Sequence, residues 1–203
     1  MMIIKKANFT ALITVLLLAL LLSGCAGTVK NMRTVPPDQV DFAPDEGKSM
    51  VVFMRPSTLG FAIQSSVFVI TEDKPSLVGI VAAKAKVSYQ LESGQHLFMV
   101  VGESADFMYA DLEANKTYYA LVTPRMGAWK ARFSLKPIHA NELGSTQFNE
   151  WIEACEWVEK SPNSDDWASE NMASINEKHK KYYAKWMEKD LSERPKLMPQ
   201  DGT

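Results

Sequence analysis

Cysteine and histidine are scarce in this sequence. Among 203 residues there are two cysteines, Cys25 and Cys155, and three histidines, His96, His139 and His179. None of the histidines stands at metal-site spacing from a cysteine, a second histidine or paired carboxylates. Nucleotide-binding glycine motifs and the G-x-S-x-G motif of serine hydrolases are also absent. We therefore predict no catalytic residue, no metal site and no cofactor, and we keep an enzyme with a dispersed site as an alternative.

The chain also lacks an apolar run long enough to span a bilayer. Near the N-terminus, residues 11–22 are almost wholly apolar, but a spanning helix needs about 20 such residues. Lys5 and Lys6 precede this stretch. A positive start followed by an apolar centre of this length is typical of a secretory signal, so we predict a signal peptide over residues 1–24.

The end of this signal differs from the usual small-residue cleavage site. Leu22, Ser23, Gly24 and Cys25 together resemble the lipobox of bacterial lipoproteins. The resemblance implies cleavage before Cys25 and attachment of diacylglycerol to its thiol, and two or three acyl chains anchor a protein stably. Ala26 stands where an aspartate would resemble the inner-membrane retention signal, which favours the outer membrane, facing the periplasm. An ordinary secretory signal and a cytosolic protein with an apolar start remain the alternatives.

Neither sign of charge is in large excess. Removal of residues 1–24, which hold two lysines and no acid, changes the net charge from −2 to −4. A weakly acidic chain does not favour a nucleic-acid partner. Cys155 would then be the single free thiol, so no intramolecular disulfide is expected. We interpret it as a buried small hydrophobe and keep pairing between chains as the alternative.

The residues after Cys25 predict a tether. Residues 25–48 contain Pro36, Pro37 and Pro44 with few large apolar side chains. As a flexible linker of this length they would place a domain about 25 Å from the bilayer. Whether Val35, Val40 and Phe42 pack on the domain is left open.

The pattern then changes to short strands, which continue to residue 138. Apolar, β-branched or alternating segments are typical of strands, and they occur at residues 50–55, 65–71, 87–91, 96–101, 107–112, 117–123 and 129–136. The last begins at Trp129. Segments at this spacing predict a mainly β fold over residues 49–138, an antiparallel β-sandwich of about seven or eight short strands.

Residues 139–203 predict a helical C-terminal segment. Phe148, Ile152, Cys155 and Val158 recur at helical spacing, and a second helix is expected from Ser164. Lysines are frequent in the later turns of this second helix. We interpret them as a solvated face, with contact to anionic lipid as the alternative.

Three motifs within residues 48–138 resemble one family. They are Arg55-Pro56, the turn sequence 91–96 (LESGQH) and the sequence 112–119 (LEANKTYY). Together they resemble a family of uncharacterised bacterial lipoproteins with a small PEGA-like β-sandwich domain. Asn115 stands where that family usually has glycine, and asparagine tolerates a positive φ. The resemblance implies a fold and supplies no catalytic residues.

Aromatic side chains gather in the C-terminal segment. Trp151, Trp157, Tyr182 and Trp186 form a candidate partner surface, although they could instead dock the helices on the sandwich. The function predicted from the sequence is a lipid-anchored binding or scaffold protein of the cell envelope, without catalytic activity. Its partners would be membrane lipid through acylated Cys25 and an envelope protein. An accessory subunit of an envelope complex is the alternative.

Overall fold

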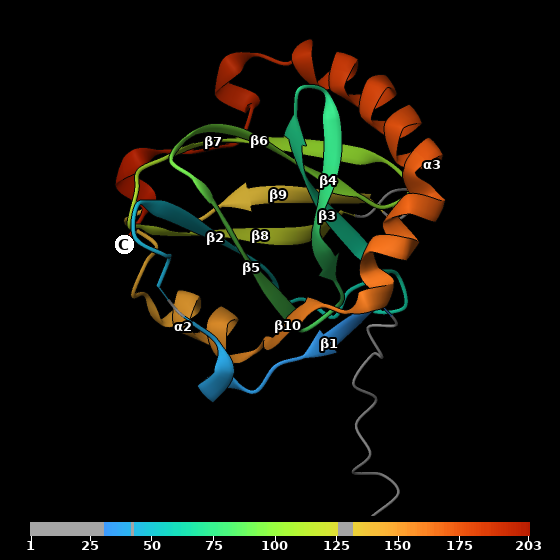
Figure 1. The fold of residues 1–203 in the computed structure, drawn as a ribbon. Coiled ribbons are helices and arrows are strands. Elements are labelled where there is room, and N and C mark those ends of the chain that lie inside the picture. Colours follow the sequence, from blue (N-terminus) through green and yellow to red (C-terminus); the bar gives the residue numbers. More distant parts are fainter. Residues whose placement is uncertain (1–30, 42, 126–131) are drawn as a thin grey trace, which may run out of the picture.

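The computed structural model describes residues 31–41, 43–125 and 132–203. The predicted signal peptide and lipobox, with Cys25, lie outside the described residues, as do Phe42 and the start of the predicted strand at Trp129. The described chain is mainly β, with two sheets packed face to face in a sandwich-like arrangement and a long C-terminal helix (Figure 1). The predicted fold class is confirmed.

Each sheet is built from strands distant in the sequence. The first sheet runs in the order β1 (Met32–Thr34), β10 (Glu156–Lys160), β5 (Ala85–Glu92), β2 (Lys48–Arg55), β8 (Thr117–Arg125) and β9 (Arg132–Pro137). The second runs in the order β11 (Lys196–Leu197), β7 (Ala105–Leu112), β6 (Gly94–Val101), β3 (Ser65–Thr71) and β4 (Lys74–Val81). The pairs β2–β8, β10–β5 and β11–β7 are parallel, so the sheets are mixed rather than purely antiparallel as predicted.

The core explains the continuous apolar run of β2. Val51 and Phe53 face the space between the sheets, where the Phe53 and Phe98 ring centroids lie 5.0 Å apart. Alternate residues Met50, Val52 and Met54 face a second cluster on the outer side of the first sheet. A strand covered on both faces needs apolar residues at every position.

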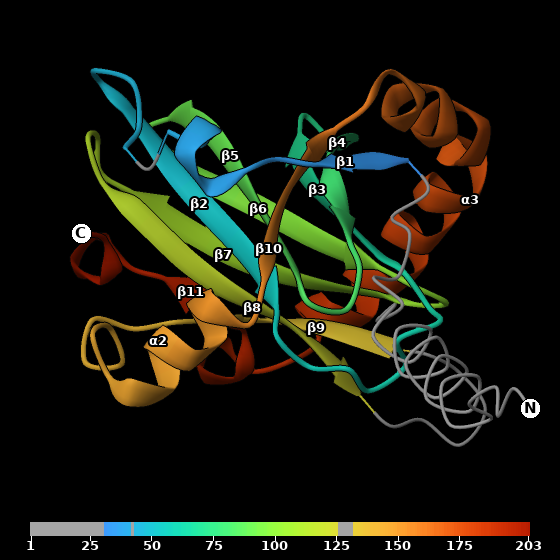
Figure 2. The ribbon, with the colours of Figure 1, turned by 90° about the horizontal axis from the view of Figure 1, so that it is seen from below.

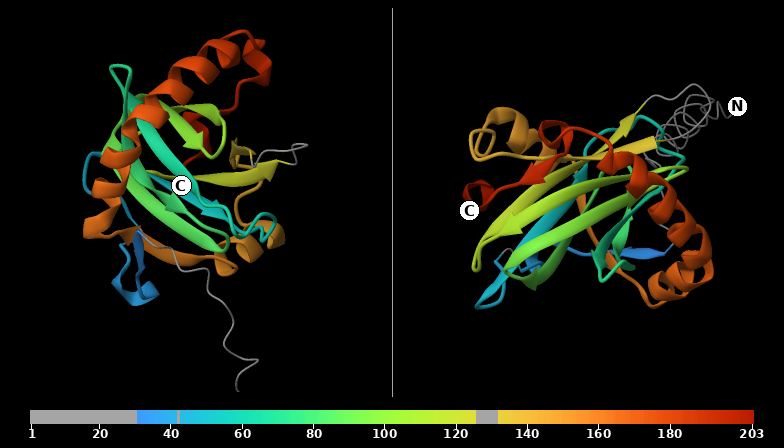
Figure 3. Two further views of the ribbon diagram at one scale, coloured as in Figure 1. Left: turned by 90° about the vertical axis from the view of Figure 1, so that its right-hand side faces the viewer. Right: turned by 90° about the horizontal axis from the view of Figure 1, so that it is seen from above.

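The helices cover different faces of the sandwich (Figures 2 and 3). α2 (Thr146–Glu153) covers the second cluster through Phe148, whose ring meets that of Tyr119 at 5.0 Å. α3 (Pro162–Met187) packs on β7 and β4 through Ala168, Ile175 and Trp186. Single 3₁₀ turns lie at η1 (Pro37–Gln39), η2 (Leu191–Glu193) and η3 (Pro199–Asp201). None of the described helices is long and apolar enough to cross a membrane.

The helix predicted through Cys155 and Val158 is wrong at these two residues. α2 ends at Glu153, and the chain continues as β10 between β1 and β5. The spacing of four apolar residues fits a helix over two turns, but the sheet offers two strands with unpaired edges at this place. Backbone hydrogen bonding to both neighbours therefore outweighs the local helical pattern.

Among the longer strands, β4 was not predicted. β4 pairs with β3 through a two-residue turn in which Glu72 and Asp73 have φ of 50° and 61°. A hairpin turn with two positive φ values is usually signalled by Asn-Gly or Asp-Gly, and Glu-Asp gives no such signal. Pro75 and Gly79 within β4 also weaken its strand pattern.

Part of the predicted tether belongs to the fold. β1 pairs with β10, and Val35 and Val40 pack on the second cluster.

Asn115 has φ +63°, as its turn requires, and its Oδ1 accepts a hydrogen bond from the backbone N–H of Gly47 at 2.8 Å.

Candidate functional site

Asn31, the first residue that the structure describes, is held at the start of α3, and we call it the attachment point. The Asn31 carbonyl accepts hydrogen bonds from the hydroxyls of Ser161, at 3.0 Å, and Ser164 at the start of α3. The next residue, Met32, is buried in the main core. Gly79 faces it, and a Cβ there would lie 3.0 Å from the Met32 methyl group. Five residues, 26–30, therefore separate Cys25 from a firmly held position of the fold.

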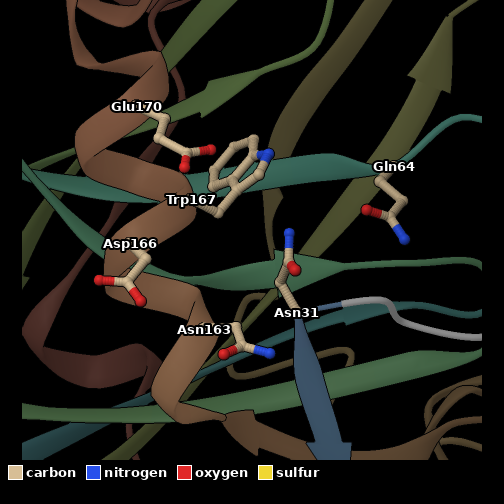
Figure 4. Close-up of a pocket in the computed structure, with 6 residues that line it drawn as sticks. All are labelled: Asn31, Gln64, Asn163, Asp166, Trp167 and Glu170. Atoms are coloured by element: carbon tan, nitrogen blue, oxygen red, sulfur yellow. The ribbon is translucent and has the colours of Figure 1, made fainter.

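A polar pocket of about 430 Å³ borders the attachment point (Figure 4). Figure 4 shows Asn31 between Gln64 on one side and residues of α3 on the other, among them Asp166, Trp167 and Glu170. No group of three or more potential metal-binding side chains exists in the described part of the chain. The pocket shows that the loop ending at Gln64 lies beside the attachment point.

This loop, residues 56–64, is shaped by a buried arginine. Arg55 is 0% exposed, and its guanidinium donates to the carbonyls of Ile63 (2.7 Å), Leu59 (2.9 Å) and Gly60 (2.8 Å). It also lies 4.7 Å from the centre of the Phe133 ring. Burial lowers the pKa of Arg55 below its usual value, and three charge-assisted hydrogen bonds compensate for lost hydration. The hydrogen bonds from the buried Arg55 guanidinium thus hold the loop backbone in place.

Sequence reasoning missed this role of Arg55. Arg55-Pro56 stood out as a turn motif, whereas the function of the arginine depends on a loop that closes over it. The sequence nonetheless contained a signal that this loop is unusual. Three large apolar residues fall within a segment between strands, where polar residues are the norm.

A larger, mostly apolar cavity of about 750 Å³ lies on the opposite side of β1 and β10 from the main core. It forms where the segment after β1 and the end of α2 close over β10. Its walls include Val35, Pro36, Ile152 and Trp157. A concave apolar site with few polar groups suits an apolar ligand.

Lys86 and Cys155 are buried polar residues of this cavity, whose lining also includes Thr34, Glu153 and Glu156. Lys86 Nζ donates to the carbonyl of Ile152 at 2.5 Å and lies 4.8 Å from the Trp157 ring centre. Burial lowers the pKa of Lys86, whereas it raises the pKa of the Cys155 thiol to about 11. A thiol with a pKa raised this far stays protonated near neutral pH, so burial makes Cys155 a poor nucleophile.

The four aromatic residues of the candidate partner surface do not come together. Trp151 and Trp157 belong to the second cluster, whereas Tyr182 and Trp186 belong to the main core on α3. Trp157 and Trp186 are buried, and the Trp186 ring packs against Phe107 (5.8 Å) and Tyr109 (5.0 Å). Trp186 therefore docks α3 on β7.

The three histidines lie apart, each in a structural contact. His179 is buried against Phe107, and burial lowers its pKa. The Nε2 of His96 is 2.8 Å from the Glu92 carbonyl.

His139 Nδ1 lies 3.0 Å from Asp201, whose carboxylate also accepts from the backbone N–H groups of Ala140 and Met198. A carboxylate bound by two main-chain donors from separate segments fastens the C-terminus to residues 139–140. Neither His139 nor Asp201 lines the cavities described above.

Comparisons with known proteins add little to this geometry. A scan against protein-family models finds no match, and a search of curated proteins finds none. Among solved structures, an NMR structure of a protein from Eubacterium rectale aligns with 45% of this chain and 88% of its own, at 8% identity and a TM-score of 0.29.

Proposed function

We propose that the protein is a lipid-anchored binding or scaffold module of the cell envelope, facing the periplasm from the outer membrane, without catalytic activity of its own. The observation that carries the proposal is the lipobox-like sequence ending at Cys25, followed after five residues by Asn31, whose carbonyl is hydrogen-bonded to Ser161, and by Met32, which is buried in the core. The motif resemblance to envelope lipoproteins supports the same function.

The mostly apolar cavity beside β10 is the binding site that this proposal uses. Its walls suit an aliphatic or aromatic group, and Lys86 offers a buried amine to an acidic or carbonyl end of the ligand. Native mass spectrometry of protein purified from envelopes should show bound mass. The variant Ile152→Trp, which fills the cavity, should lose that mass, whereas Ile70→Trp on the second sheet should retain it.

The anchor has a direct test. The variant Cys25→Ser cannot carry a thioether-linked lipid, so it should leave the membrane fraction and fail to incorporate labelled palmitate. Cys155→Ser keeps the attachment residue and serves as the matched control. Membrane fractionation of Cys25→Ser at the wild-type level, with normal cleavage of residues 1–24, would contradict the proposal.

A second candidate is an accessory subunit of an envelope complex. The half-exposed Trp151, with Lys136 Nζ 5.8 Å from its ring centre, provides a contact point of the kind that interfaces use. Cross-linking in intact envelopes, followed by purification of the lipidated chain, should give a partner of fixed stoichiometry that Trp151→Ala loses. If no cross-link depends on Trp151, this candidate is wrong.

A further inference from the structure

An uncharged loop presents three large apolar side chains to solvent. Residues 56–64 read PSTLGFAIQ and contain no acidic or basic residue. Leu59, Phe61 and Ile63 are 50%, 73% and 39% exposed. Exposed apolar residues gathered on one segment indicate a surface that meets a partner or a membrane.

The backbone of the loop is fixed independently of these side chains. Arg55 binds the carbonyls of Leu59, Gly60 and Ile63, and a turn bond joins the Ile63 N–H to the Gly60 carbonyl at 2.9 Å. Gly60 has φ +65°, a conformation that glycine adopts without strain. The side chains of Leu59 and Ile63 are therefore not needed to hold the loop, and they remain free for an external contact.

The length of chain before Asn31 limits how far the loop lies from the lipid. Six residue steps join Cys25 to Asn31, and a fully extended chain covers about 3.5 Å per step, so the two residues are at most about 21 Å apart. Gln64, the last residue of the loop, lines the same pocket as Asn31 (Figure 4). The short chain before Asn31 thus limits how far the lipid on Cys25 can lie from a residue that lines the same pocket as the loop.

We propose that the loop 56–64 inserts Leu59, Phe61 and Ile63 into the bilayer that holds the lipid on Cys25. The proposal rests on the lipid anchor of the proposed function and adds an orientation to it. Anchoring keeps the loop at high effective concentration near the lipid, so a modest apolar surface is enough to stay inserted. Because the loop carries no charge, the contact is with acyl chains and is insensitive to salt.

The test uses the lipidated chain with the exposed Ala62 replaced by cysteine. Cys25 is blocked by its lipid and Cys155 is buried with a raised pKa, so a thiol-reactive, polarity-sensitive fluorophore should label position 62 alone. The protein is reconstituted in phosphatidylcholine vesicles with or without acyl-chain-brominated lipid. We expect the emission to shift to shorter wavelength and to be quenched by bromine, at low and at high salt.

Matched controls separate insertion from general proximity. A label at Ala184, exposed near the far end of α3, should show neither shift nor quenching. The variant Leu59→Ser/Phe61→Ser/Ile63→Ser should abolish both signals at position 62 with the free energy of unfolding unchanged. The other exposed apolar pair, in Met187→Ser/Leu191→Ser, should leave them intact.

Each outcome decides the proposal. If mass spectrometry shows lipid on Cys25 but the label at position 62 stays in water, or is shielded without bromine quenching as a protein partner would shield it, loop insertion is wrong and the anchor stands. If Cys25 carries no lipid, the anchor and the insertion fall together.

Discussion

At the scale of single residues, Arg55 places a charged group in a fully buried position. Its fully buried charge is met by three loop carbonyls and the Phe133 ring. Lysine lacks the planar fork that reaches several carbonyls at once. Arg55→Lys should therefore lower the free energy of unfolding by about 2–4 kcal/mol in urea titrations. Arg33→Lys, at an exposed pair with Glu159, should change it by less than about 0.5 kcal/mol, and equal effects would contradict this account.

We expect the ionisation of Cys155 to make the free energy of unfolding depend on pH in the alkaline range. Its thiol has a pKa of about 11 in the fold, raised by burial, against about 8.5 in an unfolded chain. The unfolded state therefore loses its proton first, so the free energy of unfolding is highest below about pH 8.5 and falls as pH rises toward 11. The loss should approach about 1.4 kcal/mol per pH unit within this window.

The measurement is urea unfolding from pH 8 to pH 11, compared with Cys155→Ala in the Cys25→Ser background. The alanine variant starts less stable because a buried group is removed, so the slopes are compared rather than the absolute values. Parallel slopes would mean that Cys155 titrates normally. Ellman's reagent gives an independent check, since the native thiol should react far more slowly at pH 8 than the unfolded one.

At the scale of elements, the sequence patterns predicted the strands that are long and carry their own signal. β3 spans Ser65–Thr71, the predicted range, because its β-branched and aromatic residues have no helical spacing. β1, β10 and β11 were not predicted, since they have three, five and two residues and exist through pairing with distant strands. The role of Arg55 could not be predicted for the same reason, since it depends on contacts formed only in the fold. Its guanidinium binds loop carbonyls that the turn places within hydrogen-bond distance.

β11 shows how much a two-residue strand can contribute. Leu197 is fully buried in the main core beside β7, although it lies near the C-terminus. Leu197→Ala should lower the free energy of unfolding by about 2–5 kcal/mol, since it removes buried methyl groups and leaves a cavity. The same change at Leu191, which is strongly exposed, should cost less than about 0.5 kcal/mol. Thermal and urea unfolding of both variants provide the comparison, and a small effect at Leu197 would show that the C-terminal segment detaches at little cost.

At the scale of the whole molecule, the attachment point and the exposed loop define one end, and α3 leads away from it (Figure 1). α3 begins at Pro162, next to Ser161 that binds Asn31, and spans 26 residues, or about 39 Å. Lys180 and Lys185 lie about 27–35 Å along this helix, several Debye lengths from its start. If the loop is inserted as proposed and α3 leads away from the bilayer, these lysines would lie beyond the reach of lipid headgroups.

This arrangement separates the two ways in which the protein could lie on a membrane. In vesicles containing anionic lipid, Lys180→Gln/Lys185→Gln should leave the fluorescence of the lipidated, Ala62-labelled protein unchanged, and so should an increase in salt to about 0.5 M, where screening is nearly complete. If the helix instead lay along the surface through its lysines, the label at Ala184 would be quenched at low salt and released by either change. That result would assign the membrane contact to α3. Quenching confined to position 62 would assign it to the loop that Arg55 holds.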